Sequence, residues 1–171
     1  MGQTTAAQSA PENLTLKIAG PDTVGQPVTR FFTPDQFAAL RKLGELLAPP
    51  FNDRPGSGEA AAAEFLDFYV SQSAADIQKL YRDGLDRLNS EAHRSQSMPF
   101  AALTSSQAAP ILKPLSEPWT YAGPSDAFAK FLIAAKEDLM RATTNSRAYT
   151  TAASATSRGG GGLGYYWLPV E

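Results

Sequence analysis

The sequence has 171 residues, enough for one domain with a substantial core and too few for two. Its formal net charge of -2, with 43% hydrophobic and 19% charged residues, leaves no strongly basic surface for nucleic acid. There is no cysteine and a single histidine, His93. This composition excludes disulfides, thiolate catalysis, iron–sulfur or covalent haem ligation and an ordinary zinc site, so we expect no cofactor in this chain.

Residues 1–30 are expected to form an extended arm, because they are rich in Gly, Pro, Thr and Ala. Within the arm Leu14, Leu16 and Ile18 alternate as in an isolated strand. The arm has neither a twin arginine nor the apolar core of a signal peptide. A signal that had been removed and replaced by a cloning start would leave the same small, polar run at 3–11, and both alternatives stay open. No stretch approaches the roughly 20 apolar residues of a membrane span.

The first helix is predicted at residues 34–48. Thr33 suits the cap, Pro34 the first helical position and Gln36 the partner position of a capping box. Phe32 and Phe37 are placed to form a hydrophobic staple. The predicted apolar face consists of Phe37, Leu40, Leu43 and Leu47. Two prolines then remove backbone donors and end the helix.

Two further helices are predicted at 59–70 and 73–93. In the first, Phe65, Phe68 and Tyr69 lie on one side, and their bulk predicts a central, buried position. The expected inner residues of the second are Ile77, Leu80, Tyr81, Leu85 and Leu88. On its outer face Asp83 and Arg87 have the spacing of an ion pair one turn apart.

Two more helices complete the predicted bundle. Thr104 and Gln107 form a second capping-box pattern before a short helix, and Ser125 is expected to cap a last helix that ends near Ala142. The short helix is expected to carry Ile111, Leu112 and Leu115 on its face, and the last helix an apolar stripe of Phe128, Phe131, Leu132, Ala135, Leu139 and Met140. No strand pair is evident. We therefore predict an all-α fold, a single irregular bundle of about five helices at residues 31–145.

Residues 146–171 are predicted to be a flexible docking tail, because four consecutive glycines precede an aromatic end. The residues expected to bind a partner are Tyr165, Tyr166, Trp167 and Leu168 of the tail and Leu14, Leu16 and Ile18 of the arm.

Candidate chemical groups are few. His93 ends a helix, where a solvated imidazole is expected. The pair Asp83 and Asp86 is interleaved with basic residues, which indicates a solvated face, whereas Glu64 and Asp67 are expected to form salt bridges to a partner. A di-iron bundle needs two Glu-x-x-His motifs and is excluded. The sequence GGGGLG at 159–164 matches the dinucleotide pattern but lacks its strand, helix and later acid.

The order of several segments resembles the gluconate 2-dehydrogenase subunit 3 family over most of residues 31–171. These segments are FFTPDQFAALRKLGELLAPP, AAAEFLDFYV, LYRDGLDRLN, the Q...IL..L stretch and GLGYYWLP. The resemblance implies a small subunit without chemistry of its own, which accompanies a flavin-dependent dehydrogenase of the glucose-methanol-choline type acting on sugars or sugar acids. It implies FAD in that partner, often a cytochrome c subunit, a role in folding and export, and a periplasmic complex.

Two features depart from this family pattern: the arm has no twin-arginine signal, and glycines are inserted near the end. The first leaves a cytoplasmic location open. The alternative interpretation is a stand-alone cytoplasmic helical domain that binds a protein or a small apolar ligand between its helices.

Overall fold

A computed structural model describes residues 30–118 and 123–157, with the side chains of 156 and 157 left out. The described part is mainly helical and contains no strand beyond an isolated bridge between Phe51 and Arg54. Its six α-helices are α1 (Pro34–Leu47), α2 (Ala62–Ser71), α3 (Ala75–Gln96), α4 (Ser105–Ala108), α5 (Ala127–Thr144) and α6 (Arg147–Ser157). Two 3-10 helices flank α4, η1 (Phe100–Ala102) and η2 (Lys113–Ser116). The predicted all-α bundle is confirmed.

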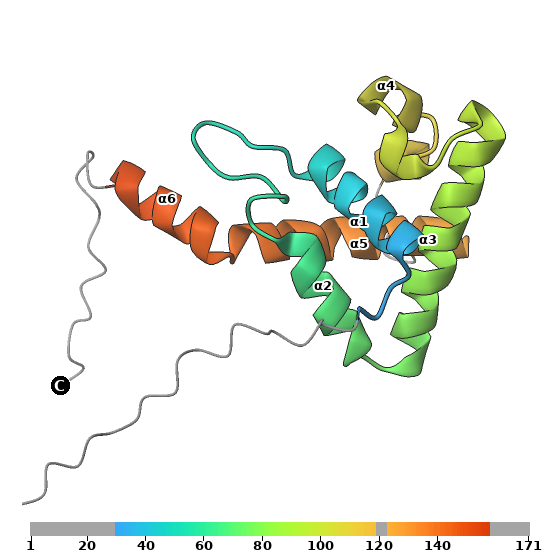
Figure 1. Ribbon diagram of the computed structural model, residues 1–171, viewed down its shortest axis with the longest axis horizontal. Helices are drawn as coiled ribbons and strands as arrows, with labels where there is room; N and C mark the ends of the chain where they lie inside the picture. The colour runs from blue at the N-terminus through green and yellow to red at the C-terminus, as the bar shows by residue number, and fades with distance from the viewer. Residues whose placement is uncertain (1–29, 119–122, 158–171) are drawn as a thin grey trace, which may run out of the picture.

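Helix α5 lies at the centre of the bundle. It contacts α1, α2 and α3 along its length and η2 near its start. Figure 1 shows α6 continuing beyond α5 and projecting from the bundle, on the same side as α2 and the loop that joins α1 to α2. No helix had been predicted at α6, which lies in the first part of the segment assigned to the tail.

The start of α1 follows from its local sequence. Thr33 Oγ1 accepts the Gln36 N–H at 3.3 Å, and Gln36 Oε1 accepts the Thr33 N–H at 3.2 Å, so the predicted capping box is present. Phe32 and Phe37 are both buried. Gln36 Nε2 donates to Asp86 Oδ1 of α3 at 2.8 Å, which fixes α1 against α3.

Three local predictions are wrong in detail. Asp126 caps α5 in place of Ser125, because its carboxylate accepts the Ala129 N–H at 2.9 Å at the positive end of the helix. Asp83 pairs with Lys79 and not with Arg87, whose guanidinium reaches Asp126 at 3.4 Å instead. Helix α2 begins three residues later than predicted, after Ala61 in the left-handed region at φ 52°.

The core joins α3 to α5 through aromatic rings. Tyr81 lies edge-on to Phe131, with ring centroids 5.7 Å apart, and its hydroxyl donates to Asp138 Oδ2 at 2.6 Å. Burial, and then this hydrogen bond, raise the pKa of Tyr81 far above its usual range. The buried phenol therefore stays protonated and acts as a structural donor.

Gly84 sets the approach of α3 to α5. A Cβ at this position would lie 2.1 Å from Phe131 Cγ, and Phe131 is fully buried. Neither helix can carry extra volume here unless the other shifts.

We expect Gly84→Ala to lower the free energy of unfolding by about 1–3 kcal/mol, since overpacking forces the Phe131 ring from its place. Urea denaturation measures the change. Gly58→Ala is the matched control, because a Cβ at Gly58 meets nothing within 4 Å. Equal midpoints for the two variants would contradict the close α3–α5 contact.

Candidate partner interface

The described residues present no constellation that suggests chemistry. Among them no group of three or more His, Asp or Glu side chains is arranged to hold a metal ion. His93 is exposed near the end of α3, as predicted. Asp83 is paired with Lys79, and Asp86 accepts from Gln36, so the second carboxylate pair belongs to a solvated, structural face.

Helix α2 carries its large aromatic residues on the outside. Phe65, Phe68 and Tyr69 are 54%, 65% and 45% exposed, and the rings of Phe65 and Tyr69 stack with centroids 6.0 Å apart. We call these three residues the α2 aromatic face. The prediction that they are buried is wrong.

Small residues explain why α2 faces this way. The side that packs inward consists of Ala62, Ala63, Leu66 and Val70. Alanines let α2 lie close to α1 and α5, which it contacts, and they leave no space for phenyl rings at that seam. The aromatic residues of the other side of the helix are consequently left at the surface.

Asp67 anchors the arm to α2. This carboxylate is 7% exposed and accepts the backbone N–H groups of Phe32 at 2.9 Å and Phe31 at 3.2 Å. The expected salt bridge from Asp67 to a partner is therefore wrong: both oxygens are used within the chain. Glu64, one turn earlier, is exposed.

Cationic side chains hold the rings beside this anchor. The guanidinium of Arg82 lies 4.1 Å from the centroid of Phe31, and that of Arg30 lies 3.6 Å from Phe37. The backbone at residues 30–32, where the arm meets the bundle, is thus held by α1, α2 and α3.

A groove of about 330 Å³ runs beside the α2 aromatic face, between α2, the end of α5 and the start of α6. Its apolar lining includes Phe65, Leu66, Tyr69 and Ala142, and its charged lining consists of Asp138, Arg141 and Arg147. We call it the α2–α5–α6 groove. Its position makes it continuous with the aromatic face.

The model of the family described as gluconate 2-dehydrogenase subunit 3 matches residues 34–166, more than half of the chain. The chain belongs to the gluconate 2-dehydrogenase subunit 3 family. The family name describes a subunit of a dehydrogenase complex. Comparison with curated proteins and with solved structures found no match. The resemblance predicted from the sequence is confirmed.

The residues predicted to bind a partner lie outside the described residues. They are Tyr165, Tyr166, Trp167 and Leu168 of the tail and Leu14, Leu16 and Ile18 of the arm. They stay predictions. In the described part of the chain no helix is long and apolar enough to cross a membrane.

Sequence reasoning missed the α2 aromatic face and the Asp67 anchor. The sequence did contain one signal for the anchor. Asp67 lies next to Leu66 and one turn before Val70, so it is an acid on the side of α2 that is otherwise apolar and buried. Its partners are more than thirty residues away, and local spacing does not identify them.

We expect Asp67→Ala to lower the free energy of unfolding by about 1–3 kcal/mol, because it leaves two backbone donors beside the core without acceptors. It should also release residues 30–32, seen as faster amide exchange at Phe31 and Phe32. Glu64→Ala is the matched control on the same helix and should change stability by less than about 0.5 kcal/mol. Unchanged exchange in Asp67→Ala would contradict the anchoring role.

Proposed function

We propose that this chain is a non-catalytic accessory subunit. It binds and stabilises the catalytic subunit of a flavin-dependent dehydrogenase acting on sugars or sugar acids, and it assists the maturation and export of that subunit. Membership of the subunit 3 family supports the proposal most directly. In this proposal FAD resides in the partner, a cytochrome c subunit receives electrons in complexes that contain one, and the assembled complex works in the periplasm.

The α2 aromatic face is the structural observation that carries the proposal. Large apolar residues at a surface are costly in water unless another surface covers them. The buried polar side-chain atoms of the described part all have hydrogen-bond partners, as with Asp67 and Tyr81. The exposed aromatic face is therefore the feature of the described residues that calls for a binding partner.

The α2–α5–α6 groove favours a second candidate, a stand-alone domain that binds a peptide or a small apolar ligand. Its volume of about 330 Å³ lies at the lower end of ligand sites. The two candidates differ in whether a dehydrogenase depends on this chain.

Co-expression of this chain with its dehydrogenase catalytic subunit should raise the yield of soluble, FAD-loaded dehydrogenase severalfold. A subunit that binds only the folded partner shifts the folding equilibrium by mass action, by about 2.7 kcal/mol at a concentration 100 times its Kd. Flavin absorbance per mole of dehydrogenase and the soluble yield measure the effect. The control is co-expression with an unrelated helical protein of similar size. A dehydrogenase that matures equally well in that control would support the stand-alone domain.

The tail is proposed to be a second docking element. Tyr165, Tyr166, Trp167 and Leu168 are too few for a core of their own, and aromatic anchors of this type often dominate interface energies. The alternative is that these residues complete the core of this chain itself.

Deleting residues 159–171 should weaken binding to the dehydrogenase and leave the melting temperature of the isolated chain nearly unchanged. Calorimetry on the complex and on the free chain measures both. A full-length variant with Tyr165, Tyr166, Trp167 and Leu168 replaced by serine separates the aromatic contribution from tail length. A large loss of thermal stability with intact affinity would instead place the tail in this chain's own core.

A further inference from the structure

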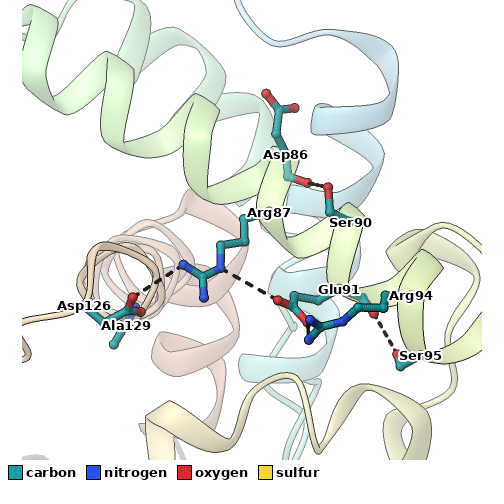
Figure 2. Close-up of polar contacts among 8 residues, drawn as sticks. All are labelled: Asp86, Arg87, Ser90, Glu91, Arg94, Ser95, Asp126 and Ala129. Atoms are coloured by element: carbon teal, nitrogen blue, oxygen red, sulfur yellow. Dashed lines mark hydrogen bonds and ion pairs between the residues drawn. The ribbon is translucent and has the colours of Figure 1, made fainter.

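Two exposed surfaces of the bundle differ sharply in chemical character. The outer face of α3 is charged, and its charges are paired within the chain. Arg87 lies 3.8 Å from Glu91 and 3.4 Å from Asp126, Glu91 also pairs with Arg94, and Ser90 and Ser95 donate to backbone carbonyls one turn back. Figure 2 shows this network joining α3 to the start of α5. Such a surface is stable in water and offers little to a partner.

The surface formed by α2 has the opposite character. Its three exposed aromatic residues are accompanied on the helix by one exposed charge, Glu64. With roughly 200 Å² for a fully exposed aromatic side chain, the α2 aromatic face presents about 300 Å² of apolar surface. Patches of this size on a monomer are often functional.

The area of the face limits what covers it. A standard interface buries about 800 Å² on each partner. A symmetric dimer of this chain through the face alone falls well short of that value. Any occupant must therefore make further contacts nearby, and membership of a family of dehydrogenase subunits favours a dehydrogenase partner over a second copy.

The described part of the chain begins beside this face, and α6 starts at the groove and carries the chain away from it to Ser157. Residues 1–29 lead into Arg30, and the next two residues are bonded to Asp67 of α2 itself. Arg147 at the root of α6 lines the same groove as Phe65 and Tyr69. When extended, the chain from Ile18 to Arg30 spans at most about 40 Å, and residues 158–171 span at most about 45 Å. A partner seated on α2 is within reach of both segments.

The groove adds a charge preference. Arg147 has no ion-pair partner among the described residues, and Arg141 has only a 3.5 Å contact to Asp138 with its own side chain 66% exposed. Both arginines line the groove together with Phe65 and Tyr69, and the one acid in its lining, Asp138, is the residue that Arg141 contacts. A groove of this composition is complementary to an apolar side chain that is followed or preceded by a carboxylate.

We propose that the α2 aromatic face and the α2–α5–α6 groove form the central contact of this subunit with the dehydrogenase catalytic subunit. The groove takes an apolar side chain of that subunit, and Arg141 and Arg147 bind a neighbouring carboxylate. This inference rests on the proposed function.

The test is the affinity of purified full-length variants for the purified, FAD-loaded dehydrogenase subunit. The double variant Phe65→Ser, Phe68→Ser should bind roughly 30-fold or more weakly, as expected for central aromatic anchors. Phe51→Ser is the control: Phe51 is 71% exposed, lies in the loop between α1 and α2 and does not line the α2–α5–α6 groove. It should stay within about 3-fold of the unmodified chain. Circular dichroism and thermal melting establish that each variant is folded.

A separate variant tests whether the charge of Arg147 contributes to binding. Arg147→Glu should slow association and weaken the dependence of the association rate on salt, whereas Lys136→Glu, an exposed cation elsewhere on α5, should leave the salt dependence nearly unchanged. Equal salt dependence for the two variants would overturn the assignment of a carboxylate to the groove.

The remaining outcomes are distinct from one another. If the unmodified chain binds and the double variant binds equally well, the face is not the contact, while the proposed function stands. If the unmodified chain does not bind the dehydrogenase at all, the proposed function fails, and this inference fails with it. If the isolated chain forms a dimer that the double variant abolishes, the face is an interface between copies of this chain, and the inference is overturned.

Discussion

The close contact between Gly84 of α3 and the ring of Phe131 on α5 is the constraint on which the rest of the bundle depends. Without a side chain at Gly84, the two helices approach closely enough for Tyr81 to pack edge-on against Phe131 and to reach Asp138. This contact fixes α5, and α5 in turn supports α1, α2 and the start of α6. The candidate interface lies on those supported elements, so its shape depends on a contact in the interior.

The orientation of α2 shows how packing distance decides what a surface presents. Either side of this helix is apolar enough to be buried. The side with alanines is buried, and these small residues let α2 lie close to α1 and α5. Phe65 and Phe68 remain outside, so the isolated bundle lacks the hydrophobic stabilisation that burying them would give. In the complex that we propose, the surface of the partner covers them.

The elements that were predictable from the sequence have local causes. The capping box of Thr33 and Gln36 fixes the start of α1, and the one at Thr104 and Gln107 fixes the start of α4, because each uses atoms three residues apart. The all-α class followed from helical periodicity in the same way. Helix α6 was missed because its Thr, Ser and Ala residues carry no wide apolar stripe, although Tyr149 there lies under Arg54 of a distant loop.

The candidate site was less predictable, since it depends on contacts between distant segments. Nothing near Asp67 indicates that Phe31 and Phe32 supply its hydrogen bonds, and periodicity alone gives no choice between the two apolar sides of α2. The tail and arm residues were proposed from composition, which identifies sticky segments but not the surfaces they meet.

The Asp67 anchor recognises peptide N–H groups and no side-chain atom of the arm. Any residue other than proline at positions 31 and 32 supplies those donors. The direction in which the polypeptide enters the bundle is therefore independent of what precedes it. A leader or a purification tag added before residue 1 therefore leaves the hydrogen bonds that hold residues 31 and 32 in place.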